Sequence, residues 1–212
     1  MGVIYVALGM TVAAVGLLLW FLSHEHYLYG FFKMLASTGF IFLCISSGGI
    51  HSAYGLIILV GLVLSWWGDL FLISRGAGIF MLGLVSFFLA HICYIAAFIV
   101  YGTDLSSALI ALAALIVPCA FIVRWLHPHL GKMRIAVYAY MCVITLMAAL
   151  SVSAAAAHGG LLIPLGAILF FCSDIFVARD RFVRPGNINA YIGLPLYYSG
   201  QVLLAMTPLY VQ

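Results

Sequence analysis

Two aspartates that lie inside apolar segments are the residues of this sequence best suited to chemistry. They are Asp69 and Asp174, 105 residues apart in a chain of 212 residues. An ionised aspartate at the centre of a membrane-spanning helix costs about 2.5–3.5 kcal/mol on insertion scales, so such residues are functional candidates. Two carboxylates in one poorly solvated cleft favour sharing a proton. One can then act as a general acid while the other, as an anion, orients water or stabilises a cation, which suits hydrolysis through an oxocarbenium-like state.

A structural role is the alternative for both aspartates. Each could cap the end of its helix or pair with a nearby basic residue, for which Arg75 and Arg179 are the candidates. The local sequences favour a shared role, because Gly68-Asp69-Leu70-Phe71-Leu72 is similar to Ser173-Asp174-Ile175-Phe176-Val177. We therefore predict that Asp69 and Asp174 are paired catalytic residues.

Polar residues in further apolar segments could position water or substrate. His91 and Tyr94 share a face of the segment 78–101 by their spacing, and a histidine in mid-span needs a hydrogen-bond partner. Gln201 lies deep in the segment 189–211, where an unpaired amide would be costly. The alternative for His91 and Gln201 is a packing role, satisfied by a neighbouring helix. The residues predicted to position water or substrate are Ser65, His91, Tyr94, Tyr197, Tyr198 and Gln201.

Basic residues near the predicted inner leaflet are candidates for binding a phosphate group. They are Lys33, Arg179, Arg181 and Arg184. A role in membrane topology and surface charge alone is equally open for these four residues.

Two histidine pairs raise the question of a metal. His24-Glu25-His26 and His127-Pro128-His129 both lie between apolar runs, but they are far apart in the sequence. We predict no metal site and no cofactor, since the sequence has no Gly-rich phosphate loop, no GxSxG elbow and no HExxH motif. The five cysteines lie in apolar segments without CxxC spacing, so we expect small buried hydrophobes rather than disulfides.

The composition sets the environment in which these residues must work. Hydrophobic residues make up 67% of the chain and charged residues 6%, against about 45–50% and 25% in soluble domains. This excludes a soluble globular enzyme, a disordered chain and a nucleic-acid binder. A spanning helix needs about 20 apolar residues, so eight would use about 160 residues and leave no loop long enough for an extramembrane domain.

Apolar runs bounded by polar or turn residues predict an all-α protein with eight transmembrane helices in a single domain. With eight spans, every Lys and Arg lies in, or beside, the loops after the first, third, fifth and seventh spans. The positive-inside rule then places these loops in the cytoplasm and both termini outside. The predicted spans are 3–22, 29–47, 53–73, 78–101, 105–125, 134–157, 161–178 and 189–211.

The two halves of the chain have polar residues at similar distances after their aspartates. His91 and Tyr94 follow Asp69 at nearly the spacing at which Tyr198 and Gln201 follow Asp174. Four helices per half is an even number, so the halves 1–104 and 105–212 would form a parallel repeat with one membrane orientation.

Four groups of residues resemble the motifs of the YhhN-like lysoplasmalogenases, in their order and over essentially the whole chain. Lys33 also resembles a lysine of that family, although Met34 stands where the family often has proline. The four groups are Ser65-Trp66-Trp67-Gly68-Asp69, Ala90-His91-Ile92-Cys93-Tyr94, Ser173-Asp174 and Tyr197-Tyr198-Ser199-Gly200-Gln201.

The resemblance implies an enzyme that hydrolyses the vinyl-ether bond of lysoplasmalogens. The products would be a fatty aldehyde and glycerophosphoethanolamine or glycerophosphocholine, and the two aspartates would be essential. The substrate would be a lysophospholipid taken from the membrane, and no nucleic acid or protein partner is predicted. We expect a multi-pass protein of a bacterial inner membrane with the acids toward the cytoplasm.

Two other function classes compete with this interpretation. A small proton- or solute-coupled transporter also uses paired intramembrane acids in repeats, although no spans here are broken by Gly and Pro at matching places of both halves. A lipid-binding or assembly protein without catalysis is the third class. Aldehyde release from a lysoplasmalogen discriminates between all three.

Overall fold

The computed structural model describes residues 2–22, 26–74 and 76–211, and for His26 the backbone alone. The predicted all-α fold is confirmed, since the described residues form α-helices and short helical turns without strands. The last α-helix ends earlier than predicted, at Met206, and a 3-10 turn with Pro208 follows it. The helices are α1 (Gly2–Phe21), α2 (His26–Ser46), α3 (Ala53–Leu72), α4 (Ala77–Tyr101), α5 (Leu105–Leu126), α6 (Arg134–His158), α7 (Leu162–Ala178) and α8 (Asn187–Met206).

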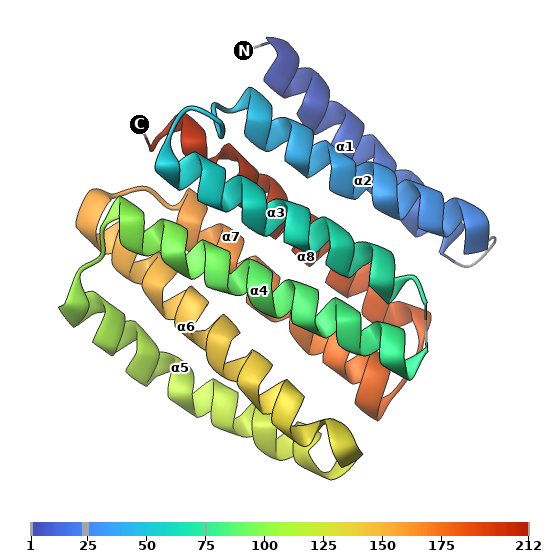
Figure 1. Cartoon of the computed structure of the whole chain (residues 1–212). Helices are drawn as coiled ribbons and strands as arrows, with labels where there is room; N and C mark the ends of the chain where they lie inside the picture. The colour runs from blue at the N-terminus through green and yellow to red at the C-terminus, as the bar shows by residue number, and fades with distance from the viewer. Residues whose placement is uncertain (1, 23–25, 75, 212) are drawn as a thin grey trace.

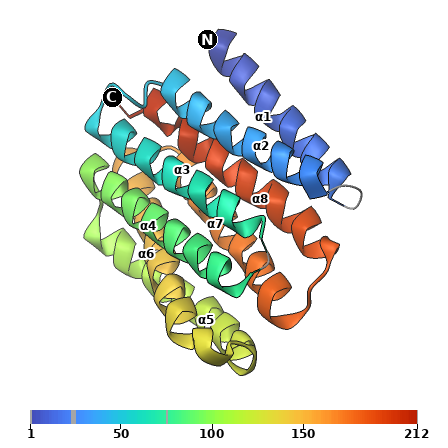
Figure 2. The same cartoon turned by 45° about the vertical axis from the view of Figure 1, so that its right-hand side comes forward.

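The helices pack in sequential pairs, which form one bundle (Figure 1). The pairs are α1 on α2, α3 on α4, α5 on α6 and α7 on α8, and α2 and α6 join their own pairs to α3 and α7. Contacts of α4 with α6 and of α2 with α8 connect the two halves of the chain. Figure 2 shows α1 at the outer edge of the bundle, and Figure 1 shows α5 at the opposite edge.

The apolar surface of the bundle matches a lipid environment. Tyr5 of α1 is 67% exposed, and Ile110 and Phe121 of α5 are 71% and 70% exposed. Within the described part, α1 to α6, and α7 together with the helical turn Arg179–Val183 that continues it, are long and apolar enough to cross a membrane, while α8 does not reach that hydropathy. The chain is therefore a multi-pass membrane protein.

Glycines allow close helix contacts where the site is built. A Cβ on Gly200 of α8 would lie 2.8 Å from the carbonyl oxygen of Gly166 in α7. The backbones of these two helices are therefore in direct contact at this point. A Cβ on Gly61 of α3 would lie 2.5 Å from the ring of Tyr94 in α4. Small residues at helix interfaces in membranes permit this approach, which here holds Tyr94 against α3.

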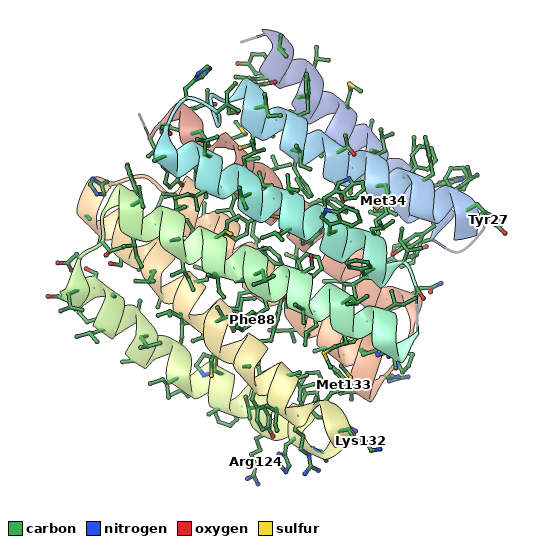
Figure 3. All side chains as sticks on the ribbon, in the orientation of Figure 1. Tyr27, Met34, Phe88, Arg124, Lys132 and Met133 are labelled. Atoms are coloured by element: carbon green, nitrogen blue, oxygen red, sulfur yellow. The ribbon has the colours of Figure 1, made fainter. Side chains whose placement is uncertain are left out.

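Both described ends of the chain lie at one end of the bundle, and the turns after α3, α5 and α7 lie at the other (Figure 1). Arg124 and Lys132 mark this second end in Figure 3, at the turn between α5 and α6. We call it the basic end, because Arg179, Arg181 and Arg184 follow α7 there. Asp69 and Asp174 lie within the last turns of α3 and α7, close to the basic end.

Candidate active site

The bundle contains a partly open cavity of about 490 Å³ that both aspartates line. Its walls come from the basic-end halves of the helices, with Lys33 from α2, Tyr140 from α6 and Tyr197 from α8 beside the two acids. Residues 69 and 174 are far apart in sequence, and α3 and α7 both border the cavity, which brings the two acids to one site.

Asp69 is a buried carboxylate with a cation as its partner. Its Oδ1 atom lies 3.2 Å from Nζ of Lys33, and the two side chains are 3% and 4% exposed. The Lys33 ammonium also donates to the backbone oxygen of Asp69, at 3.0 Å. Oδ2 accepts hydrogen bonds from Ser37 at 2.7 Å and from Tyr197 at 2.6 Å. Both oxygens are thus engaged by donors, which favours the ionised form.

Asp174 has a different environment, although it lines the same cavity. Oδ2 of Asp174 accepts a hydrogen bond from the hydroxyl of Tyr140, at 2.5 Å. No Lys or Arg of the described ranges forms an ion pair with Asp174, whereas Lys33 pairs with Asp69. The alternative role as the partner of Arg179 is not what the structure shows, since that guanidinium donates to Asn189. The two acids therefore differ in charge environment.

A chain of hydrogen bonds leads away from Asp69 through residues that the sequence predicted for the site. Tyr197, which bonds Asp69, accepts from Nε2 of Gln201 at 3.2 Å. Tyr94 donates to Oε1 of Gln201 at 2.9 Å, and the hydroxyls of Ser65 and Tyr94 lie 3.3 Å apart. Of these, Tyr197 lines the cavity, and the others stand behind it. Their geometry suits orienting Tyr197 rather than touching substrate.

Tyr198 supports the other side of Asp69. Its hydroxyl donates to the backbone oxygen of Lys33 at 3.0 Å and lies 3.2 Å from Oγ of Ser37. Tyr198 is 2% exposed, so it fixes the α2 segment that carries Lys33 and Ser37 without reaching the cavity.

His91 is fully buried behind the cavity wall. Its Nδ1 atom donates to the backbone oxygen of Phe87 at 2.5 Å, which makes Nε2 the acceptor nitrogen. Nε2 has no hydrogen-bond partner within the described part of the chain. The ring packs against Phe170 and against Tyr140, at 5.3 Å between ring centres for the tyrosine. His91 therefore supports the ring of Tyr140, the partner of Asp174.

The residues predicted for phosphate binding fall into different places. Lys33 reaches Asp69, and Arg179 donates to Oδ1 of Asn189 at 2.5 Å. The Arg184 backbone oxygen accepts from the same asparagine, at 2.9 Å. Arg181 lines the cavity and stands over the ring of Phe80, 4.4 Å from its centre. Arg181 and Lys33 are thus the two of this group on the cavity.

Three features of the site were missed by the sequence reasoning. Ser37 lies one helical turn after Lys33, and this spacing places both on one face of α2. A lysine in an apolar segment also calls for an acidic partner, which was a usable signal for Lys33 and Asp69. Tyr140 had no such signal, because a tyrosine in an apolar run fits many positions.

Of the two histidine pairs, the structure describes the side chains of the second, His127 and His129. His24-Glu25-His26 lies outside the described side chains, and so does Arg75. Nδ1 of His127 lies 2.5 Å from the hydroxyl of Tyr138. The described residues contain no group of three or more His, Cys, Asp or Glu side chains that could hold a metal ion.

Known proteins share much of this sequence. The YhhN family matches residues 28–207. Lysoplasmalogenase TMEM86A of Bos taurus is 32% identical over 71% of this chain and 64% of its own length. The human protein of the same name is 31% identical over the same shares of the two chains.

A bacterial relative extends the comparison. A lysoplasmalogenase of Mycobacterium tuberculosis is 27% identical over 67% of this chain and 55% of its own length. The chain thus spans less than two thirds of the length of these relatives. No solved structure matches the chain. Since the family match covers nearly all the helices that line the cavity, this chain belongs to the YhhN family.

Proposed function

We propose that this protein hydrolyses the vinyl-ether bond of lysoplasmalogens to a fatty aldehyde and a glycerophospho headgroup compound. The observation that carries the proposal is the pair of acids on one cavity, one held by Lys33 and the other bonded by Tyr140. Relatives that are named lysoplasmalogenases support the substrate class. A cavity with an apolar wall and a few polar groups suits a single-chain lipid.

In the proposed mechanism Asp174 is the general acid. It lies on the cavity without a described cation beside it, so the neutral acid is favoured in this poorly solvated place. Tyr140 donates to Oδ2, which leaves Oδ1 to carry the proton. That proton goes to the alkene carbon remote from the ether oxygen, and the alkene electrons form the new C–H bond. The product is an oxocarbenium ion.

Asp69 stabilises that cation and stays ionised throughout. Lys33, Ser37 and Tyr197 already engage its oxygens, so its contribution is electrostatic rather than proton transfer. The Asp174 carboxylate takes a proton from the attacking water, and a hemiacetal forms. Asp174 then donates that proton to the glycerol oxygen as the C–O bond of the hemiacetal breaks. Its carboxylate takes the proton of the hemiacetal hydroxyl as the C=O bond of the aldehyde forms, which regenerates the acid.

We propose that all eight helices cross the membrane, with both termini outside and the basic end in the cytoplasm of a bacterial cell. The 20 residues of α8 have the length of a span, and α8 packs beside α7. Asn189 and Gln201, which lower its hydropathy, are buried and hydrogen-bonded within the bundle. The basic residues of the turns after α5 and α7 support the orientation.

We also propose that the chain is a parallel repeat of four helices. The packing of α1 on α2 corresponds to that of α5 on α6, and the contact of α2 with α8 corresponds to that of α6 with α4. Each catalytic acid lies near the end of the third helix of its half. Each also accepts a hydrogen bond from the second helix of its own half, through Ser37 and Tyr140.

The test of the function uses the purified full chain in detergent with lysoplasmenylethanolamine. We expect release of a long-chain aldehyde in stoichiometric amounts with glycerophosphoethanolamine. The saturated alkyl-ether analogue should yield no product, because it has no alkene carbon to protonate. Absence of aldehyde together with solute flux in liposomes would instead support the transporter.

A second prediction concerns Tyr140. We expect Tyr140→Phe to lower kcat about 10- to 100-fold, because the hydroxyl that fixes Asp174 is lost. Tyr138→Phe is the matched control on the same helix, since Tyr138 bonds His127 and does not line the cavity. An equal loss of activity in both variants would show that Tyr140 has no particular role.

A further inference from the structure

We propose that Arg181 and Asp180 form a headgroup subsite for a zwitterionic phosphodiester, in which Arg181 binds the phosphate and Asp180 the ammonium group. The inference rests on the proposed function and identifies the side chains that would recognise the headgroup. Both residues line the same cavity as the two catalytic acids, at its basic end.

Asp180 and Arg181 are consecutive in the sequence, and both line the cavity. They belong to a π-helical turn, η3 (Arg179–Val183), which continues α7 beyond its last α-helical residue. Their Cα atoms are about 3.8 Å apart, as in any trans peptide. Short π-helical turns are rare and occur frequently at functional sites.

The distance from the reacting centre also fits. Arg181 lies seven positions after Asp174, an axial rise of about 10 Å at 1.5 Å per residue. In a lysoplasmalogen the carbon that takes the proton is separated from phosphorus by seven covalent bonds of about 1.5 Å, which extend to about 9 Å. A substrate whose vinyl ether meets Asp174 therefore places its phosphate near Arg181.

The contacts of the turn hold both charges in place. Phe80 of α4 lies under the Arg181 guanidinium, at 4.4 Å from the ring centre. Oδ1 of Asp180 accepts from the backbone N–H of Gly186 at 2.8 Å and from Nδ2 of Asn189 at 3.0 Å. Asn189 is 2% exposed, and its Oδ1 atom accepts a hydrogen bond from the Arg179 guanidinium. Asp180 is thus fixed through one carboxylate oxygen, and the residue lines the cavity.

The other basic candidates fit this role less well. Lys33 forms an ion pair with Asp69, so a phosphate bound to Lys33 would compete with the catalytic carboxylate. Arg179 and Arg184 do not line the cavity. One positive and one negative side chain at the cavity end match a headgroup of zero net charge, whereas a headgroup that is only anionic meets Asp180 as a repulsive neighbour.

The experiment compares three vinyl-ether substrates in detergent: lysoplasmenylethanolamine, the alkenylglycerophosphate without the amine, and alkenylglycerol without phosphate. For Arg181→Gln we expect KM to rise about 10- to 100-fold with the two phosphate substrates, with kcat little changed. With alkenylglycerol the variant should match the wild type, and this shows that it is folded. Arg181→Lys should recover part of the loss.

Asp180→Asn gives the second readout, because asparagine keeps an oxygen for Gly186 and Asn189 but loses the charge. We expect KM to rise several-fold for the ethanolamine substrate and to fall for the alkenylglycerophosphate. Opposite shifts of this kind would not follow from a purely structural role. Arg124→Gln is the control, since Arg124 lies at the basic end but off the cavity.

Binding of the non-hydrolysable alkyl-ether lysolipid separates the subsite from catalysis. If the wild type hydrolysed no vinyl ether but bound this ligand, and Arg181→Gln weakened binding at least 10-fold, the subsite would stand and the proposed function would fail. Equal KM changes for all three substrates, or none for any of them, would overturn the headgroup assignment.

Discussion

Replacement of Asp174 by asparagine is expected to lower kcat for lysoplasmalogen hydrolysis by about 10²- to 10⁴-fold, the range of general acid catalysis. Asparagine keeps the shape of the side chain and an oxygen for the Tyr140 hydroxyl, so the cavity wall is retained. It has no acidic proton to give to the alkene carbon. Aldehyde release measured over a range of substrate concentrations should therefore show a lower kcat with KM within a few-fold.

Asp104→Asn is the matched control for this variant. Asp104 lies at the other end of the bundle as the N-cap of α5, where hydrogen bonds from the Ser107 side chain and backbone hold its pKa below the ordinary value. Asparagine caps helices about as well as aspartate, so stability and activity should be unchanged.

Isotope labelling tests the same step independently. In D₂O the wild type should place deuterium on the carbon next to the aldehyde group. An aldehyde without deuterium, formed at an undiminished rate, would rule out protonation at carbon.

Removal of one member of the Lys33–Asp69 pair is expected to cost about 3–5 kcal/mol of stability, because the other is left as an uncompensated buried charge. Both Lys33→Met and Asp69→Asn should therefore lower the unfolding temperature in detergent strongly. The double variant carries neither charge and should recover most of that stability. Thermal unfolding of the four proteins measures the coupling directly.

Activity in the same four proteins should follow a different pattern. The double variant should remain inactive although it is folded, because no carboxylate then faces the cation. Restored hydrolysis in the double variant would mean that Asp69 serves stability alone. Single variants as stable as the wild type would mean that the pair is not energetically coupled.

The helices could be predicted from the sequence because hydropathy in a membrane protein acts over whole segments. Each predicted span contains most of an observed helix, and the two acids fall at the predicted ends of α3 and α7. Which segments face each other is decided by side-chain packing, for which local sequence carries little information. That Tyr140 of α6 meets Asp174 follows from such packing.

The two acids illustrate this limit most clearly. Their local sequences are similar, so the sequence does not indicate which of them is the acid and which is the anion. The difference arises from α2 and α6, which supply a lysine to one acid and a tyrosine to the other. Likewise, the local sequence does not indicate which of Arg179, Arg181 and Arg184 lies at the site. In the structure Arg181, in the π-helical turn, is the one of the three that lines the cavity.

The Lys33–Asp69 pair has a consequence for how the chain is inserted into the bilayer during synthesis. Each residue alone in its segment raises the free energy of insertion, by about 2.5–3.5 kcal/mol at the bilayer centre and by less toward the helix ends, where Asp69 lies. They lie on consecutive helices, α2 and α3, which contact each other. We expect the hairpin of α2 and α3 to leave the translocon as an electrically neutral unit, so biogenesis favours the arrangement that catalysis later uses.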